Sequence, residues 1–454
     1  MLKNSLIACS FLAATISFAT TSAPFASGVS GDLKWEVRFN LPSCKHEGGK
    51  ENAWCLYTDQ KKNSKKSGIA DKLKNWAFDD EVKSLHLAYF SFSNKTVRFT
   101  LCDASEMGKN VNIYLDQSNS DSLDMWFDEE CKDRSNINVY GLGAPFNSEN
   151  GHLQHAKVFL ASTTTGLKTY KEMNTVQRKA ARGRNLRFTS SSANMSSNGL
   201  ALHFENWMFL ETKENKNLAQ KNICLFKSFE KVSNSVVQDA RSYFSESFQE
   251  CVGDISAKKR SDLDFYVVPA AKGMPLPFDG MKKLVFDTKA YLRVAIHRLT
   301  TASVYKWLIS GASKRGVDVK LIFDDDTLRT GVQDGGNAHD VGESDIKAYR
   351  YLRDNTKAEI SFMETNAVTI PALGGVPHLF HNKFMISDGK ALFQGAGNFT
   401  GRALNTYGPG NYEQFYIIRI PEVVKAYEDG WNVLRSRSTL RADHPVGHHA
   451  DIEM

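Results

Sequence analysis

An internal duplication is the feature that most constrains how this chain of 454 residues can fold. In the second half, apolar runs at Leu292–Leu299, Val317–Phe323 and Ile360–Met363 predict strands, and stretches at 302–314 and 346–353 predict helices between them. The first half follows the same order less clearly, with predicted strands at 85–91, 111–116, 137–140 and 155–160 and a helix through 124–127. Two copies of one element order predict two similar α/β units around a pseudo-two-fold axis.

Each copy leads to a strand that carries His and Lys two positions apart. These pairs are His381 with Lys383 in the second half and His155 with Lys157 in the first. Two residues spaced in this way leave the same face of a strand. If the two units are related by a pseudo-two-fold axis, we expect the two His-x-Lys strands to meet at their interface.

An amide follows each of these strands. In the second half, Asp388-Gly389 predicts a turn, and the Gly395–Gly397 loop then delivers Asn398. In the first half the run from Ser191 to Asn194 supplies the matching amide. An imidazole, an ammonium and an amide at one point suit a phosphodiester, because imidazole can attack phosphorus or move a proton while the other two hold the oxygens.

The second copy resembles the signature of the phospholipase D superfamily, His-x-Lys-x-x-x-x-Asp followed by Gly-Ser-x-Asn. The matching residues are His381, Lys383, Asp388, Gly395 and Asn398, with Ala396 where the family usually has Ser. The first copy matches at His155, Lys157 and Asn194 but has Ser162 in place of the signature Asp and Ser191 in place of its Gly. The signature Asp supports the strand and phosphate loop, and the tyrosyl-DNA phosphodiesterase branch also lacks it. The resemblance therefore implies that the first copy is catalytic too.

The resemblance implies a duplicated phospholipase D-like fold, α/β in class, with two mixed-sheet units. It also implies a phosphodiesterase that works through a phosphohistidine and needs no metal or other cofactor. By this resemblance His155 attacks phosphorus, His381 acts as acid and base, and Glu205 and Glu413 orient the opposing histidines. The implied catalytic residues are His155, Lys157, Asn194, Glu205, His381, Lys383, Asp388, Asn398 and Glu413.

Two basic stretches bear on the substrate. An insertion between Lys157 and Asn194 contains Arg178, Lys179, Arg182 and Arg184, which we predict to bind substrate. Because the insertion connects two parts of the site, we expect it at the pocket mouth, holding a polyanion or an anionic membrane. Residues 30–80 are also polar and Lys-rich, and there the pattern predicts a solvated loop.

The substrate remains open between several classes. An exported two-motif chain with apolar residues near the site, Leu373 and Val376-Pro377, favours cleavage of phospholipid head groups. The basic insertion and the net charge of +6 favour a secreted nuclease acting on DNA or RNA. A third alternative is a catalytically degenerate phosphate-binding module, against which the two complete sets of His, Lys and Asn argue. Transfer of the phosphatidyl group to an alcohol requires the same residues as hydrolysis.

The chain's start and its cysteines indicate export. Residues 1–26 combine one positive charge, a short apolar core and small residues, which is typical of a signal peptide. The six cysteines that follow residues 1–26 predict disulfides in a secreted or periplasmic protein. The simplest pairing joins sequence neighbours, Cys44–Cys55, Cys102–Cys131 and Cys224–Cys251.

The composition and the motif positions set the domain organisation. A content of 41% hydrophobic and 24% charged residues is that of a soluble globular protein. We predict a first unit at 30–230, a linker within 233–262 and a second unit at 262–440, with insertions at 327–342 and 370–377. The expected partner is an anionic phosphodiester, with peripheral membrane contact if it is a lipid, and the expected assembly is a monomer of two pseudo-symmetric halves.

Overall fold

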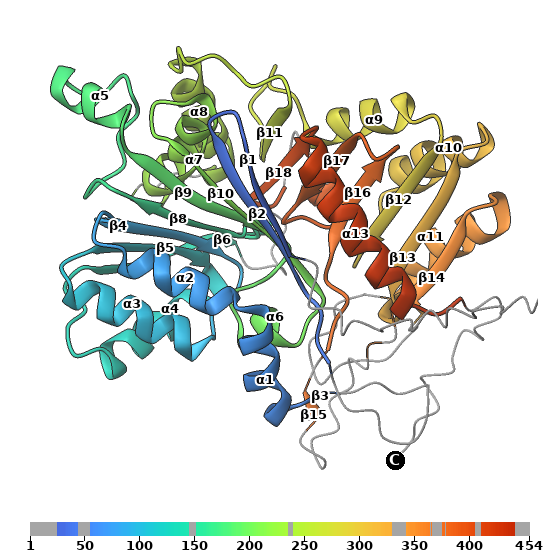
Figure 1. Cartoon of the computed structure of the whole chain (residues 1–454), viewed down its shortest axis with the longest axis horizontal. Coiled ribbons are helices and arrows are strands. Elements are labelled where there is room, and N and C mark those ends of the chain that lie inside the picture. Colours follow the sequence, from blue (N-terminus) through green and yellow to red (C-terminus); the bar gives the residue numbers. More distant parts are fainter. Residues whose placement is uncertain are drawn as a thin grey trace, which may run out of the picture.

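Two mixed β-sheets, each covered by helices, form the frame of the molecule (Figure 1). The computed structural model describes residues 25–43, 55–144, 151–234, 239–328, 342–363, 365, 375–376, 378–404 and 410–440. The predicted signal peptide, except for its last two residues, lies outside the described residues. So do the side chains of the predicted pair Cys44–Cys55 and most of the two predicted insertions.

The first sheet has nine strands in the order β1-β2-β10-β9-β8-β4-β5-β6-β7, and the second has seven in the order β11-β18-β17-β16-β12-β13-β14. The strands of the first sheet are β1 Phe25–Ser30, β2 Leu33–Asn40, β4 Ser84–Tyr89, β5 Asn110–Asp116, β6 Ile137–Ala144, β7 His152–Leu153, β8 Val158–Ser162, β9 Asn185–Ser191 and β10 Glu205–Lys213. Those of the second are β11 Leu263–Val268, β12 Tyr291–Ile296, β13 Asp318–Asp324, β14 Glu359–Met363, β16 Lys383–Ser387, β17 Ala391–Gly395 and β18 Glu413–Ile418. Two short strands, β3 Cys55–Leu56 and β15 Gly375–Val376, pair separately.

Helices fill the connections. In the first half they are α1 Tyr57–Ser67, α2 Ile69–Phe78, α3 Lys95–Glu106, α4 Gln117–Glu130, α5 Thr175–Ala181, α6 Ser197–Ala201, α7 Asn217–Ser233 and α8 Ala240–Gly253. In the second half they are α9 Pro277–Asp287, the π-helix η1 Ser303–Ile309, α10 Ser310–Lys314, the 3₁₀-helix η2 Asp325–Leu328, α11 Gly342–Asn355, α12 Gly401–Leu404 and α13 Pro421–Arg437. Within the described part, no helix is long and apolar enough to cross a membrane.

The two sheets repeat one topology. The order β2-β10-β9-β8-β4-β5-β6 of the first sheet corresponds strand for strand to the whole order of the second. β4 and β12 hold the same place in it. Each pairs parallel with the next strand in sequence and antiparallel with the strand that begins at or just after the Lys of a His-x-Lys pair. This confirms the predicted fold class, a duplicated α/β architecture with mixed sheets.

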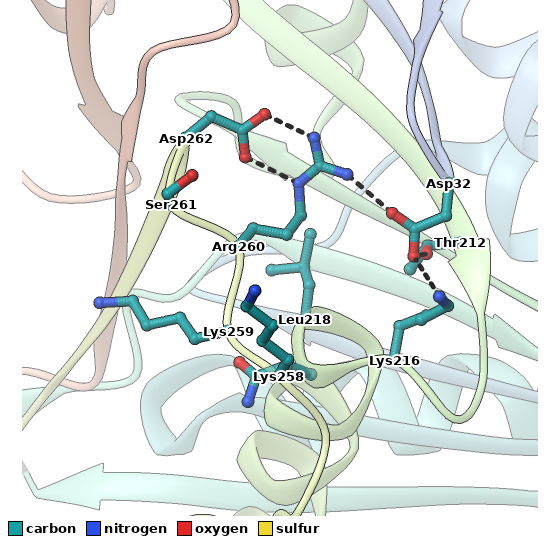
Figure 2. A pocket seen from close by; sticks show the side chains of 10 residues that line it. Asp32, Thr212, Lys216, Leu218, Lys258, Lys259, Arg260, Ser261 and Asp262 are labelled. Atoms are coloured by element: carbon teal, nitrogen blue, oxygen red, sulfur yellow. Dashed lines mark hydrogen bonds and ion pairs between the residues drawn. The ribbon is translucent and has the colours of Figure 1, made fainter.

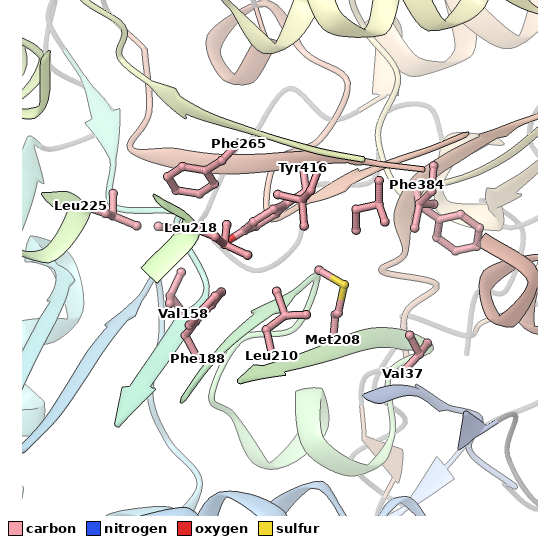
Figure 3. Packing of buried hydrophobic residues seen from close by; sticks show 14 of the residues in the cluster. Val37, Val158, Phe188, Met208, Leu210, Leu218, Leu225, Phe265, Phe384 and Tyr416 are labelled. Atoms are coloured by element: carbon pink, nitrogen blue, oxygen red, sulfur yellow. The ribbon is translucent and has the colours of Figure 1, made fainter. Parts of the chain in front are cut away.

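A continuous hydrophobic core joins the two sheets (Figure 3). Met208 and Leu210 of β10 belong to the same buried cluster as Phe384 of β16 and Tyr416 of β18. The helix that follows the last strand of each sheet also contacts the opposite sheet, α7 packing on β11 and α13 on β2. Because protein cores are close-packed, this shared core fixes the position of one unit against the other.

Two stretches differ from their predicted structure. Part of the Lys-rich segment at 30–80 forms β2, which lies between β1 and β10, and α1 and α2 come after it. In β2, buried and more exposed side chains alternate from Leu33 to Phe39. The predicted linker contains α8, which packs on α7. The disulfides Cys224–Cys251 and Cys102–Cys131 are both formed, as predicted. The first of them joins α7 to α8, so this part of the predicted linker is fixed to the first unit.

Candidate active site

The segment ahead of each His-x-Lys pair contacts the opposite unit. The amide of His381 donates to the carbonyl of Phe204 (2.9 Å), and the amide of His155 donates to the carbonyl of Tyr412 (3.0 Å). Each of these carbonyls immediately precedes the glutamate that begins β10 or β18. The histidines therefore lie just before their strands rather than on them, and each comes next to a glutamate of the other unit.

Two buried His–Glu pairs result from this crossing. Nδ1 of His155 lies 3.0 Å from Oε2 of Glu413, and Nδ1 of His381 lies 2.8 Å from Oε1 of Glu205. Both carboxylates are almost completely buried, with 1% and 0% of their residue surface exposed. A carboxylate in this position holds the proton on Nδ1 and leaves Nε2 free as base or nucleophile.

Each of the two lysines contacts the backbone of the histidine in its own pair. Nζ of Lys157 donates to the carbonyl of His155 (2.9 Å), and Nζ of Lys383 donates to that of His381 (2.7 Å). Both lysines are fully buried. Burial lowers the pKa of Lys157 to about 8, against the opposing effect of the two glutamates, and lowers the pKa of Lys383 well below 10.5. An ammonium group at this position suits the oxygens of a phosphodiester.

Burial also governs the two histidines. It lowers the pKa of His155, with Lys157 adding to the effect and Glu413 opposing it. It lowers the pKa of His381 further, and Lys383 and another histidine, His297, act in the same direction. Without a bound anion both imidazoles are therefore neutral at pH 7, the form that a nucleophile requires.

Asn194 and Asn398 each have a polar atom available to a ligand. The Oδ1 atom of both side chains is buried and has no hydrogen-bond partner among the described residues. Buried polar groups without partners are rare in proteins and often mark the place of a ligand or water. Because an amide oxygen only accepts hydrogen bonds, a contact to a phosphoryl oxygen would come from the Nδ2 donor of each side chain, with Oδ1 left to accept from water or a hydroxyl.

The Ala that replaces the signature Ser is compensated by another residue. Ser192, at the signature Ser position of the first copy, donates to Oε2 of Glu205 (2.6 Å). Ala396 stands at the equivalent position and cannot do so, but Nδ2 of Asn411 donates to Oε1 of Glu413 (3.2 Å). Each glutamate thus has a second partner that holds it toward its histidine. The sequence analysis did not identify Asn411, whose only signal is its position two residues before the glutamate.

Asp388 does not join the site, contrary to its inclusion among the catalytic residues. It follows β16 at the end opposite to His381, and its carboxylate accepts hydrogen bonds from the amides of Lys289, Ala290 and Tyr291 (2.8–2.9 Å). These three contacts anchor the start of β12. Asp388 is therefore a structural support, and it acts on the fold rather than on the substrate.

The same geometry explains why Ser162 can replace the Asp in the first copy. Ser162 ends β8, again at the end of the strand that lies away from its histidine. Its Oγ accepts a hydrogen bond from the amide of Thr164 (3.2 Å), which forms a local turn. The exchange of Asp for Ser changes a turn and leaves the catalytic groups untouched.

We expect Asp388→Ala to destabilise the protein without impairing catalysis. Loss of three charge-assisted hydrogen bonds to backbone should lower the free energy of unfolding by about 2 kcal/mol or more. The kcat of the folded variant should stay close to that of the wild type. Denaturant unfolding followed by a rate measurement checks both, with Asp388→Asn as the milder partner. A variant of normal stability with greatly reduced kcat would show that Asp388 is catalytic after all.

The basic insertion lies at the wrong end of the first sheet for its predicted role. β8 runs from Val158, beside the site, to Ser162, and β9 returns antiparallel to it. The connection between them, with α5, is therefore at the end of the strands remote from the histidines (Figure 1). Of the four residues predicted to bind substrate, Arg184 pairs with Glu214 and Arg178 donates to the carbonyl of Tyr170. The predicted placement of Arg178, Lys179, Arg182 and Arg184 at the pocket mouth is wrong.

A surface pocket lined by cations is equally remote from the histidines (Figure 2). It lies where Asp32 and Thr212 mark the ends of β2 and β10 opposite to Glu205. Arg260 donates to both Asp32 and Asp262, and Lys216 pairs with Asp32 (3.3 Å). These contacts tie the start of the second unit to the first, so we assign the pocket a structural role.

Two histidines that the sequence analysis did not identify lie against His381. The ring centroid of His297 is 4.9 Å from that of His381, and the ring centroid of His203 is 6.1 Å away. His297 directly follows β12, and His203 precedes Glu205 by two residues. Sequence periodicity gave no signal for either, because both lie outside the regular elements. In the described residues, no group of three or more His, Cys, Asp or Glu is arranged to hold a metal ion.

Comparison with known proteins agrees with this geometry. Residues 282–433 match the family model described as cardiolipin synthase, PLD-like domain. The structure of phosphatidylserine synthase from Haemophilus influenzae Rd KW20 is similar over 92% of this chain and 90% of that one, with a TM-score of 0.57 and 10% identity. NucT from Helicobacter pylori matches 39% of this chain and 98% of its own, with a TM-score of 0.30 and 17% identity. No curated protein sequence matches the chain.

The crossed His–Glu pairs bring the histidine of each unit to the interface between the two units. Residues 282–433, the greater part of the second unit, match a PLD-like domain, which agrees with the phospholipase D signature of the second copy.

Proposed function

We propose that the protein is a metal-independent phosphodiesterase that removes phospholipid head groups through a phosphohistidine intermediate. The observation that most supports this proposal is the pair of buried glutamates, each 2.8–3.0 Å from the histidine of the opposite unit. Two imidazoles with fixed tautomers at one interface provide both a nucleophile and a proton donor. A bound anionic diester favours the protonated form of Lys157 and Lys383, and their ammonium groups would then hold the phosphoryl oxygens without a metal ion.

In the first step, Nε2 of His155 attacks phosphorus and forms an N–P bond while the bond to the leaving oxygen breaks. His381, protonated on Nε2, gives this proton to the leaving oxygen, which departs as an alcohol. In the second step, His381 takes a proton from water, the resulting hydroxide attacks phosphorus, and the N–P bond breaks to regenerate His155. Asn194 and Asn398 complete the contacts to the phosphoryl oxygens.

The substrate supplies the condition for the first proton transfer. Burial and nearby cations keep the pKa of His381 low without substrate. A bound phosphodiester places a negative charge beside the imidazole, and an opposite charge at short distance favours the protonated form. Binding of the diester would thus convert His381 into an acid only when there is a bond to break.

A phospholipid is the substrate that the observations favour. The family model that matches the second unit is described by the name of a phospholipid-synthesising enzyme, and the likeness to phosphatidylserine synthase extends over nearly the whole chain. The basic insertion, on which the nuclease alternative depended, lies away from the histidines. Both sets of His, Lys, Asn and Glu are present and positioned, which argues against a degenerate binding module.

Transfer to an alcohol is a second candidate. The family description names a synthase, and an alcohol that entered in place of water would react with the phosphohistidine in the same way. Hydrolysis and transfer would then compete for one intermediate. We further propose that the protein is secreted or periplasmic, since the two disulfides suit an oxidising compartment. We also propose that it is a monomer, because one chain carries both His–Glu pairs.

A paired assay tests the substrate class. Purified protein with EDTA is given vesicles of phosphatidylcholine and phosphatidylglycerol, and separately single- and double-stranded DNA and RNA. We expect release of head groups, with phosphatidylethanol as an additional product when ethanol is added. His381→Ala is the control in both assays. Cleavage of nucleic acid that this variant loses, with lipids untouched, would make the protein a nuclease.

A further inference from the structure

The surroundings of the two central histidines differ although the fold around them is duplicated. Phe90 follows β4, and His297 follows β12, which is the equivalent strand. Each ring lies beside the histidine of its own unit, Phe90 at 6.0 Å from His155 and His297 at 4.9 Å from His381 between ring centroids. At equivalent positions of the duplicated fold, His155 therefore has an apolar ring as its neighbour and His381 has an imidazole.

A second position shows the same asymmetry. Two residues before the glutamates, the second unit has Asn411, whose amide already donates to Glu413. The first unit has His203, whose Nδ1 is 3.6 Å from Oε1 of Glu205. The His155 side thus has an apolar ring and an occupied amide, whereas the His381 side has two additional imidazoles.

These imidazoles have unused hydrogen-bonding capacity. Both ring nitrogens of His297, and Nε2 of His203, are buried without a hydrogen-bond partner among the described residues. His297 is 92% buried, since 8% of its surface is exposed. Its backbone is held in place, because its amide donates to the carbonyl of Asn382 (3.0 Å). A neutral imidazole carries one donor and one acceptor, and leaving both unpaired in a buried site costs energy unless a ligand binds them.

We propose that His297, with His203, forms a polar subsite for the alcohol that leaves phosphorus on the His381 side. This inference rests on the proposed function, in which His381 protonates the leaving oxygen. An alcohol departing there lies next to the imidazole of His297, which can donate to one hydroxyl and accept from another. The subsite therefore selects leaving groups with hydroxyls of their own, such as glycerol, over alkyl alcohols. The alcohol that enters in a transfer reaction would occupy the same subsite.

Two lipids that differ only in the leaving group test this proposal. Short-chain phosphatidylglycerol and phosphatidylpropanol carry the same diacylglycerol and release glycerol or propanol. For His297→Phe, which places the first unit's ring in the second, we expect kcat/KM for phosphatidylglycerol to fall about tenfold, the value of one or two lost hydrogen bonds. For phosphatidylpropanol the loss should be clearly smaller, because that leaving group has no further hydroxyl to bind. The readout is therefore the ratio of the two kcat/KM values, which cancels any effect of the substitution on His381 itself.

His297→Gln serves as the matched variant, because its amide restores one donor and one acceptor. We expect it to regain part of the preference for glycerol, and it carries the test if His297→Phe does not fold. Equal losses on both lipids, or no loss on either, would overturn the subsite, since His297 would then be structural or idle. A wild-type protein that cleaves neither lipid would instead refute the proposed function, and the subsite with it.

Discussion

Replacement of His381 by Ala is expected to reduce phospholipid cleavage by about 10³-fold, because an alkoxide leaves poorly without a proton donor. A p-nitrophenyl phosphodiester should behave differently, since p-nitrophenolate leaves without protonation. With that substrate the variant should release one equivalent of p-nitrophenolate rapidly and then almost stop. The reason is that the second step still needs His381 to activate water. Stopped-flow absorbance resolves this burst from the steady state.

His155→Ala is the matched variant for this experiment. Without the nucleophile no phosphohistidine forms, and we expect no burst with either substrate. Thermal melting of both variants verifies that they remain folded. A burst in His155→Ala but not in His381→Ala would reverse the two roles, and wild-type rates for His381→Ala on phospholipid would remove this histidine from the mechanism.

Exchange of the buried glutamates should produce losses that cross between the units. Glu205→Gln keeps the shape and an acceptor for Nδ1 of His381 but removes the charge that stabilises the imidazolium. We expect phospholipid cleavage to fall about 100-fold, with the p-nitrophenolate burst nearly intact. Glu413→Gln should instead slow the burst itself, because it deprives His155 of the same support. Rapid-mixing kinetics with both substrates separate these patterns.

Glu211→Gln is the control for the glutamate variants. Glu211 lies on β10 with Glu205, but it pairs with Lys34 and Asn185 at the far end of the strand. Its replacement should leave both the burst and the steady state unchanged. Identical kinetic effects of Glu205→Gln and Glu413→Gln would contradict a division of labour between the two histidines.

The duplication and most of the site residues could be predicted from the sequence, because short local patterns identify them. Apolar runs and the two His-x-Lys pairs identify the repeat, and the resemblance adds Glu205 and Glu413. The structure then brings these residues together through backbone contacts such as that between His381 and Phe204. The units meet as the pseudo-two-fold axis predicts. The segment that contains each histidine bonds to the residue just before the glutamate of the other unit.

Errors arose where the outcome depended on which end of a strand faces the interface. Asp388 is close to His381 in sequence, but the length of β16 separates them. The basic insertion joins two parts of the site, yet the antiparallel pair β8 and β9 carries it away. His203 and His297 were missed for the converse reason, since residues remote in sequence contact His381 only in the folded protein.

The proposed mechanism requires that His155 becomes covalently bonded to phosphorus with help from the other unit. The most direct test is mass spectrometry of His381→Ala mixed with a p-nitrophenyl phosphodiester, quenched at alkaline pH to preserve phosphoramidates and digested with protease. The mechanism predicts one phosphoryl adduct per chain, on the peptide that contains His155. A burst of p-nitrophenolate with His155 unmodified would contradict it.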